Sequence, residues 1–246
     1  MNAFKRFILL TFLVSAQLLS FSAWSASSIL DDPQRYGPDK ARDITSKPLE
    51  IIKFAEIKEE MHVLDLFGGD GYYSEILSKV VGPQGKVFLH NNKAYLSYIE
   101  QELQKRMARG KFVNLVKYVH EADNLLLHDE SLDSIFYVMG YHDLYHKTDN
   151  WDVDRDLLIK QLYKALKPGG TLLVIDHSAP IGTGSSYSQT KHRIAPELVV
   201  KELKSHGFKF SKQTNILANP EDDYELTPFD PKVFRKTDRF VLLFRK

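Results

Sequence analysis

The sequence predicts an α/β fold in which a mostly parallel, seven-stranded sheet carries helices on both faces. Three observations support this prediction. Apolar strand-like runs alternate with helical segments, a glycine cluster follows the first strand, and the last two strand-like runs have no helix between them. Strands separated by helices of this length run parallel in one sheet. The final strand is expected to turn back and pair as an antiparallel C-terminal strand.

Proline and glycine residues mark several element ends. Pro48 stands at the start of the first helical segment, and Gly82 with Pro83 ends the second. Pro196 and Gly207 bracket the last helix in the same way. We predict strands at residues 63–67, 86–91, 113–120, 134–139, 171–175, 208–217 and 239–244, and helices at residues 49–57, 72–81, 94–108, 154–166 and 197–206.

The N-terminal segment has the pattern of a signal peptide. Lys5 and Arg6 form a basic start, residues 7–21 form an apolar run, and a small-residue cleavage pattern follows at residues 23–25. We predict export to the periplasm of a Gram-negative source or out of the cell, without stable membrane association after cleavage. An uncleaved anchor is the alternative, although the run is short for a membrane span. The predicted parts are a signal peptide at residues 1–26, a leader at residues 27–48 and the main domain at residues 49–246.

Composition narrows the functional classes. The chain contains no cysteine, which excludes disulfides, thiolate metal sites and cysteine nucleophiles. Its formal charge is +1, and it lacks the clustered basic residues typical of nucleic-acid-binding proteins. At 43% hydrophobic residues it has enough apolar material for a globular core. We expect a small-molecule substrate and no nucleic-acid partner, and the composition leaves the oligomeric state open.

The stretch HVLDLFGGDGYYSEIL, residues 62–77, joins the first strand to its helix. Gly69 and Gly71 allow a sharp turn and a close approach of the backbone to a ligand. The spacing lacks the third glycine of the dinucleotide fingerprint. Asp65 would repel a pyrophosphate, but it can accept hydrogen bonds from an ammonium group or bound water. The stretch therefore favours a nucleoside that carries an amino acid over a dinucleotide.

This stretch resembles motif I of class I S-adenosylmethionine (SAM) dependent methyltransferases. The segments GKVFLHNN, HEADNLLLHDESLDSIF and ALKPGGTLLVID resemble the later motifs of that class, in the right order. Further segments, among them YHDLYH, IDHSAPIGTG and KTDRFVLLFRK, resemble a family of predicted exported bacterial methyltransferases. The resemblance covers roughly residues 49–246. It implies a Rossmann-like methyltransferase sheet, SAM as the cofactor and methyl transfer as the activity.

The resemblance also implies a set of cofactor-binding residues. Phe67 stands where the class has its first glycine, and Asn91 stands where it has the acid that binds the ribose hydroxyls. Asn91 can still bond a hydroxyl, but without charge assistance such a bond is roughly half as strong. The expected cofactor-binding residues are Asp65, Phe67, Gly68, Gly69, Gly71, Asn91, Glu121 and Ala122.

Histidines next to charged residues follow three segments at the expected ligand-binding edge of the sheet. They are His142–Asp143, Asp176–His177 and His192–Arg193. Removing a proton from an acceptor needs a base with a near-neutral pKa, and an acid beside a histidine raises its basicity. We predict His142 as the general base, with Asp143 beside it and His177 or His192 as a substitute. Surface hydrogen bonding and loop capping are the structural alternatives.

The same residues allow a divalent metal, although the leading prediction contains none. Divalent-metal O-methyltransferases place their ligands after the fourth and fifth strands, which implies Asp143, Asp176 and His177 as a candidate set. Two aspartates with a histidine suit Mn²⁺, Fe²⁺ or Zn²⁺ better than Mg²⁺. A ligand-binding protein or a metal-assisted enzyme on a diverged methyltransferase scaffold remains the alternative function.

Several other side chains have open roles. Tyr72 or Tyr73 could cover the cofactor. The acceptor pocket could be lined by Tyr141 and Tyr145, although aromatic residues of this kind are more often buried in the core. The segment NPEDDYE, with Asp222 and Asp223, reads as a solvated turn.

Overall fold

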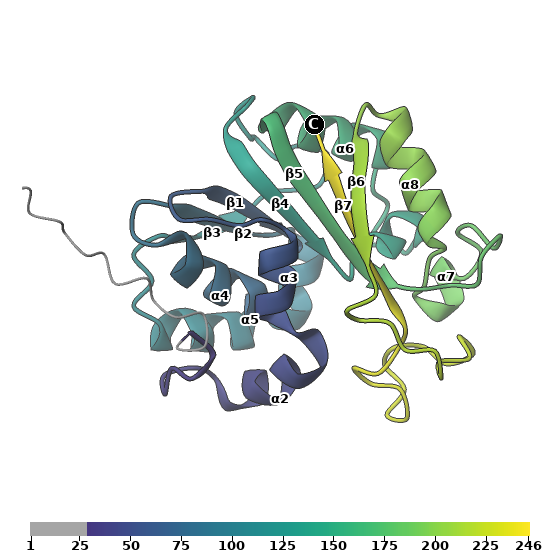
Figure 1. Cartoon of the computed structure of the whole chain (residues 1–246), viewed down its shortest axis with the longest axis horizontal. Coiled ribbons are helices and arrows are strands. Elements are labelled where there is room, and N and C mark those ends of the chain that lie inside the picture. Colours follow the sequence, from purple (N-terminus) through teal and green to yellow (C-terminus); the bar gives the residue numbers. More distant parts are fainter. Residues whose placement is uncertain (1–28) are drawn as a thin grey trace, which may run out of the picture.

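The computed structural model describes residues 29–246, and the predicted signal peptide at residues 1–26 lies outside them (Figure 1). The strands are β1 (His62–Leu66), β2 (Lys86–Asn91), β3 (Leu115–Val119), β4 (Leu132–Val138), β5 (Leu166–His177), β6 (Lys209–Thr214) and β7 (Arg239–Arg245). The helices are α2 (Gly37–Ser46), α3 (Pro48–Phe54), α4 (Tyr72–Val81), α5 (Lys93–Arg109), η1 (His142–Tyr145), α6 (Arg155–Ala165), α7 (Ser188–Lys191) and α8 (Pro196–Ser205).

The seven strands form one sheet in the order β3-β2-β1-β4-β5-β7-β6. Strands β1 to β5 pair in parallel, for example with Leu64 opposite Ile135. Strand β7 runs antiparallel to both of its neighbours, and Val174 lies opposite Leu242. The predicted fold class is confirmed, including the reversed C-terminal strand. The KPGG turn, expected before the fifth strand, instead lies within the longer β5.

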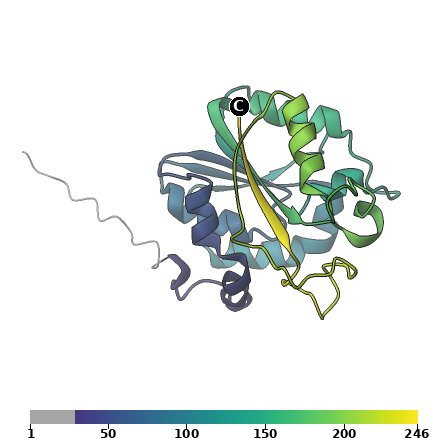
Figure 2. The ribbon, with the colours of Figure 1, turned by 45° about the vertical axis from the view of Figure 1, so that its right-hand side comes forward.

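Helices cover both faces of the sheet, as the two ribbon views show (Figures 1 and 2). Neighbouring residues of one strand serve opposite faces, as period-two alternation requires. Val63 of β1 packs in the core beneath α3 and α4, whereas Leu64 packs in the core that receives α6 and α8. Because both faces of the central strands are covered, these strands read in the sequence as nearly continuous apolar runs.

The predicted leader is part of the folded body. Residues 37–46 form α2, which the sequence reading left without an element. The side chain of Asp39 in α2 contacts Arg106 of α5 at 2.6 Å, and Asp43 accepts a hydrogen bond from the hydroxyl of Tyr72 at 2.7 Å. The domain boundary predicted at residue 49 therefore does not coincide with a break in packing. The proline-rich, charged composition of this segment gave no helix signal in the sequence, although α2 forms there and is held by ion pairs.

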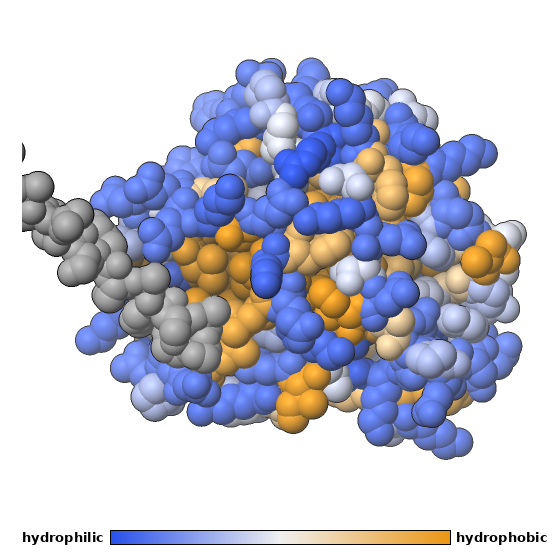
Figure 3. All heavy atoms as spheres, viewed as in Figure 1, coloured by the Kyte–Doolittle hydropathy of each residue, from blue (hydrophilic) through white to orange (hydrophobic). Residues whose placement is uncertain are grey.

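The face of the molecule seen in Figure 3 is largely polar. In the view of Figure 1, apolar side chains gather in one area over α3 and α4 (Figure 3). A hollow there is lined by Ile29, Leu49, Ile52 and Ile57 among others. Within residues 29–246, no helix combines the length and the apolar character needed to cross a bilayer.

Candidate active site

The carboxyl ends of β4 and β5 bring the predicted histidine pairs together. His142 and Asp143 begin η1 directly after β4, and Asp176 lies next to the end of β5. His192 follows α7 and adopts a left-handed backbone conformation with φ of 51°. This reversal helps to turn its ring toward His142, and the two ring centroids are 5.3 Å apart. The sequence prediction that these loops meet at one edge is therefore confirmed for His142, Asp143, Asp176 and His192.

His142 is the centre of the cluster. Its Nδ1 lies 2.7 Å from Oδ1 of Asp176, and its backbone N–H donates to Oδ2 of the same carboxylate at 2.8 Å. Its Nε2 lies 3.1 Å from Oδ1 of Asp143 and 3.3 Å from Nδ1 of His192. Because Asp176 occupies Nδ1, Nε2 is the ring nitrogen that faces the other members of the cluster.

The charges of this cluster are unusual. Burial lowers the pKa of His142, but Asp176 and Asp143 outweigh burial and raise it to about 10. Burial raises the pKa of Asp143, yet hydrogen bonds from His142 and His192 bring it below its usual range. The pKa of His177 falls well below its usual value because it is buried and faces the charge of His142. Two carboxylates therefore favour one positive charge at the position of His142 Nε2.

A second layer of side chains fixes Asp143. The hydroxyl of Tyr95, in the first turn of α5, donates to Oδ2 of Asp143 at 2.8 Å. Burial and the charge of Asp143 raise the pKa of Tyr95 well above its usual value, so Tyr95 remains a donor. The indole of Trp151 donates to the backbone carbonyl of Asp143 at 2.6 Å. His177 does not join the cluster by a direct contact, since its Nδ1 lies 2.7 Å from the hydroxyl of Thr237.

A cavity of about 1010 Å³ opens beside the cluster. This volume is at the upper end of the range for small-molecule sites, which is about 300–1000 Å³. Its wall contains the start of α5, Glu121 after β3, Met139 after β4 and the four histidines His142, His146, His177 and His192. Aromatic side chains complete it, namely Tyr95, Tyr98, Trp151 and Phe229. The cavity therefore joins apolar ring-binding surface to a polar, charged end.

The glycine loop after β1 keeps the expected backbone. Gly69 has φ of +62°, and a Cβ placed on it would meet no atom within 4 Å. A Cβ on Gly68 or Gly71 would lie within 3 Å of Leu89, so these two positions have no room for a side chain. Asn91 at the end of β2 holds the loop by accepting from Gly69 N–H at 3.0 Å and donating to Gly69 C=O at 2.9 Å.

Two predicted cofactor contacts are engaged inside the protein. Asp65 is buried and accepts from the hydroxyl of Ser74 at 2.6 Å. Burial raises its pKa to about 6. Both the oxygen and the nitrogen of the Asn91 side-chain amide are hydrogen-bonded to the backbone of Gly69. The observed contacts of Asp65 and Asn91 therefore stabilise the loop rather than present a polar group to a ligand.

Phe67 forms an aromatic wall between the loop and the cavity. Its backbone has φ of 50°, and its ring is buried against Tyr95 and Trp151 at centroid distances of 5.1 and 5.3 Å. Residues 67–71 are not among the described residues that line the cavity. At the far end, Glu121 is exposed and lines the cavity, while Ala122 is buried. The cavity thus adjoins the positions expected for the nucleoside end of a cofactor, and the wall separates it from the glycines.

Other predicted side chains lie elsewhere. Tyr72 and Tyr73 are buried and face α2 and the residues after it, through hydrogen bonds to Asp43 and to the carbonyl of Ser46. The hydroxyls of Tyr141 and Tyr145 both donate to Glu202 of α8. Neither tyrosine pair lines the cavity among the residues that the structure describes.

Asp222 was predicted to lie in a solvated turn, and this prediction is wrong. Its carboxylate is buried and pairs with Arg193 at 2.8 and 3.0 Å. Arg193 also donates to the carbonyl of Leu226, so it ties the segment before β7 to the cluster loop. No local pattern reveals this pair, because its partners are 29 positions apart.

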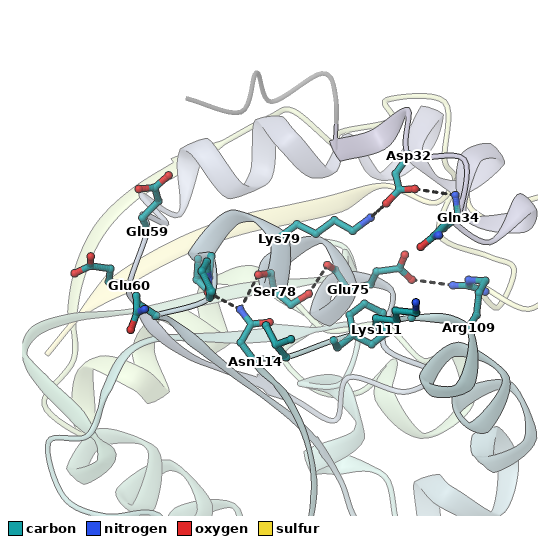
Figure 4. A pocket seen from close by; sticks show the side chains of 17 residues that line it. Asp32, Gln34, Glu59, Glu60, Glu75, Ser78, Lys79, Arg109, Lys111 and Asn114 are labelled. Atoms are coloured by element: carbon teal, nitrogen blue, oxygen red, sulfur yellow. Dashed lines mark hydrogen bonds and ion pairs between the residues drawn. The ribbon is translucent and has the colours of Figure 1, made fainter. Parts of the chain in front are cut away.

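A second hollow of about 600 Å³ lies at the opposite edge of the sheet (Figure 4). Its walls come from segments just before β1, β2 and β3, where the parallel strands begin. Four of its charged groups pair with one another, Lys79 with Asp32 and Arg109 with Glu75, as the dashed lines show (Figure 4). Ligands of such sheets bind at the carboxyl ends of the strands. We therefore assign the site to the cavity beside His142.

Comparisons with known proteins agree with this geometry. The ubiE/COQ5 methyltransferase family matches residues 45–212. The ubiquinone/menaquinone biosynthesis C-methyltransferase UbiE of Haemophilus ducreyi is 28% identical over 196 residues, covering 78% of this chain and 71% of that protein. The corresponding protein of Serratia proteamaculans is 30% identical over 164 residues, covering 64% and 61%. The crystal structure of a SAM dependent methyltransferase from Aquifex aeolicus has a TM-score of 0.60 at 22% identity, covering 90% and 98%.

The strand order with its reversed β7, the glycine loop after β1 and the family match define a class I SAM-dependent methyltransferase. The chain belongs to the ubiE/COQ5 methyltransferase family. The class uses SAM, and the cavity beside Glu121 has room for its nucleoside. The polar contacts expected from Asp65 and Asn91 do not contribute to this fit, because both side chains are already bonded within the protein.

Proposed function

We propose that the chain transfers the methyl group of SAM to a small acceptor bound in the cavity beside His142. The observation that carries this proposal is the continuity of the cavity. One wall holds Glu121, at a position expected to contact the nucleoside, and another holds the His142–Asp143–His192 cluster. A single continuous cavity can therefore hold cofactor and acceptor side by side, which is the main requirement of an in-line transfer.

SAM supplies an electrophilic methyl group on a sulfonium. In the transfer, the acceptor forms a bond to the methyl carbon, the carbon–sulfur bond breaks with its electron pair staying on sulfur, and the acceptor loses a proton. The chain must orient the acceptor, exclude water and accept or stabilise that proton. The side chains of Tyr95, Trp151 and Phe229 form apolar walls that orient the acceptor and exclude water. The His142–Asp143–His192 cluster provides the polar end where the proton leaves.

We propose proton removal as a property of this cluster rather than of His142 alone. His142 has only Nε2 available, and that atom faces Asp143 and His192. The side chain of His192 is 24% exposed, against 5% for His142, so His192 is the more accessible imidazole. His177 stays outside the cluster and lines the cavity from the end of β5.

The acceptor is expected to be small, largely apolar and ionisable at one group. The cavity walls support this, because their exposed surface is dominated by aromatic and aliphatic side chains with the charged cluster at one end. The curated relatives are named as C-methyltransferases of ubiquinone and menaquinone biosynthesis. An aromatic ring that carries an ionisable hydroxyl is consistent with both observations.

Calorimetry of the purified chain with SAM and with S-adenosylhomocysteine tests the proposal. We expect saturable binding of both, and turnover that His192→Ala and Asp143→Asn abolish while binding of S-adenosylhomocysteine stays within a few fold of wild type. His128→Ala is the matched control, because His128 is exposed and lies after β3, away from the cluster. The absence of binding heat for either ligand would remove the methyltransferase assignment from the cavity.

A second candidate function is ligand binding on a diverged methyltransferase scaffold. The observation that favours it is the aromatic wall of Phe67, Tyr95 and Trp151, which separates the glycines from the cavity. Phe67→Gly distinguishes the candidates. If the wall limits access of SAM, the variant binds S-adenosylhomocysteine more tightly than wild type. Unchanged, undetectable binding in both proteins would favour a different ligand.

We also propose that the protein acts outside the cytosol. The support is the N-terminal sequence, in which the basic start and the apolar run precede the part of the chain that the structure describes. We propose a small-molecule acceptor, no nucleic-acid partner and no stable membrane association after cleavage of the signal.

A further inference from the structure

We propose that Nε2 of His142, Oδ1 of Asp143 and Nδ1 of His192 together bind one divalent transition-metal ion, of which Zn²⁺ is the probe of choice. The three ligand atoms lie within 4.8 Å of one another at the inner end of the cavity. Nothing in the family match or in the relatives' names includes a metal.

The distances between these atoms suit a shared ion. Zn²⁺ binds histidine nitrogen and carboxylate oxygen at about 2.0–2.2 Å, so two ligands of one ion stand about 3.0–3.5 Å apart in tetrahedral or octahedral geometry. His142 Nε2 lies 3.1 Å from Asp143 Oδ1 and 3.3 Å from His192 Nδ1. The third separation, between His192 Nδ1 and Asp143 Oδ1, is slightly longer at 3.8 Å. Small side-chain adjustments of His192, which is the most exposed of the three, close this difference.

Side chains that contact His142 and Asp143 orient them for metal binding. Metal-binding histidines almost always donate their second ring N–H to a carboxylate or carbonyl, which fixes the tautomer and raises ligand basicity. His142 has this arrangement, with Nδ1 2.7 Å from Asp176. Tyr95 donates to Oδ2 of Asp143 at 2.8 Å and so leaves Oδ1 turned toward the two histidines. Two of the three ligands are therefore oriented by buried partners.

The ligand set differs from the one expected from the sequence, which was Asp143, Asp176 and His177. The carboxylate of Asp176 already accepts from His142 Nδ1, from His142 N–H and from His177 N–H, at 2.7–2.8 Å. His177 directs Nδ1 to Thr237. The structure thus moves Asp176 behind the ligands and brings in His192 from the loop after α7.

Two histidines and one carboxylate leave other positions of the ion open. This donor set suits Zn²⁺, Fe²⁺ or Mn²⁺ rather than Mg²⁺. The open positions face the cavity, where His192 and Asp143 are partly exposed. An acceptor oxygen bound there would lose its proton more easily, because the ion stabilises the resulting oxyanion. This role in proton removal rests on the proposed function. It narrows the acceptor to a hydroxyl-bearing or enolisable compound. Metal binding itself does not depend on the proposed function.

The test uses the purified full chain, freed of metal by a chelator and then dialysed. Titration with Zn²⁺ in the calorimeter is expected to show one ion per chain, and Co²⁺ is expected to give the visible absorption of a bound, low-symmetry site. Asp143→Ala and His192→Ala should both abolish stoichiometric binding. Asp176→Asn should weaken it by about 10–100-fold, as expected for a partner behind a ligand. His128→Ala serves as the matched histidine control and should bind Zn²⁺ as wild type does.

The alternative is that a proton, rather than a metal, holds the cluster together. Wild-type chain that takes up no stoichiometric Zn²⁺ would overturn the proposal in favour of this alternative. Zn²⁺ retained at one equivalent by both Asp143→Ala and His192→Ala would overturn it as well. Circular dichroism of each metal-free variant shows whether it folds, and His192→Gln replaces any variant that does not. Binding of S-adenosylhomocysteine without Zn²⁺, or of Zn²⁺ without S-adenosylhomocysteine, separates failure of this inference from failure of the proposed function.

Discussion

His90 shows how a single buried side chain supports the loop on which the site depends. It lies in β2, where Nδ1 accepts from the backbone N–H of Phe67 at 3.3 Å and Nε2 donates to the carbonyl of His120 at 3.0 Å. This arrangement requires a neutral ring, since a protonated Nδ1 could no longer accept. Burial lowers the pKa of His90 to about 4, in accord with that requirement.

The neutral state of His90 predicts a specific acid sensitivity. Its pKa is about 6.5 in the unfolded chain and about 4 in the folded one, so only the unfolded chain gains a proton between these values. The stability contributed by the neutral ring is complete above pH 6.5 and is lost as the pH falls toward 4, by up to about 3 kcal/mol. His90→Gln, which cannot titrate, should lose less stability than wild type over this window in denaturant unfolding.

The pH dependence of stability is compared between wild type and His90→Gln, because protonation of Asp65 stabilises the folded state over the same pH range. Burial raises the pKa of Asp65 to about 6, so protonation at low pH relieves a cost of the folded state. This relief grows as the pH falls from 6 toward 3.8 and is the same in wild type and in His90→Gln. Identical pH profiles for the two proteins would mean that His90 is not held neutral.

At the scale of elements, Arg106 of α5 joins three separate segments. Its side chain is 2% exposed and contacts Asp39 of α2 at 2.6 Å, Asp70 of the glycine loop at 2.8 Å and Glu75 of α4 at 2.5 Å. Burying this many carboxylates is costly unless a cation accompanies them. Arg106 of α5 therefore fixes the relative positions of α2, the glycine loop and α4.

Arg106→Met is expected to destabilise the fold by about 3–5 kcal/mol, because it leaves the buried carboxylate of Asp39 without a partner, whereas Glu75 keeps Arg109 and Asp70 is partly exposed. Lys105→Met, one position away, is the control, since Lys105 is 64% exposed and pairs only with Glu102 within α5. Thermal and denaturant unfolding should show a large loss for the first variant and none for the second. Equal stability of the two variants would contradict the role given to Arg106.

Most of the long strands and helices could be predicted from the sequence because they depend on local periodicity and on proline and glycine signals, whereas α2 could not. The meeting of His142 and Asp176 followed from one rule, that parallel strands end at the same edge. The finer site did not follow, because it depends on side-chain directions within loops. The ring of His192 reaches His142 from a left-handed residue, and Tyr95 reaches Asp143 across 48 positions of sequence. Neither contact has a local sequence signal.

At the scale of the whole molecule, two features of the composition bear on the proposed export. The chain has 246 residues and no cysteine, so oxidation outside the cytosol can form no disulfide in it. Removal of residues 1–26 takes away Lys5 and Arg6 and no acidic residue, which changes the formal charge from +1 to +1 − 2 = −1. Both features are compatible with the proposed export.

Export predicts a defined change in mass. The chain recovered from the periplasm of a Gram-negative host, or from the medium of another, should lack the residues before the cleavage pattern at residues 23–25 or shortly after it. Intact-mass spectrometry of each cell fraction measures this directly. Leu10→Arg places a charge within the apolar run and should leave an uncleaved chain in the cytosol, because transport needs that run to be apolar. A wild-type chain that keeps its full mass and stays in the cytosolic fraction would show that residues 1–26 are no signal.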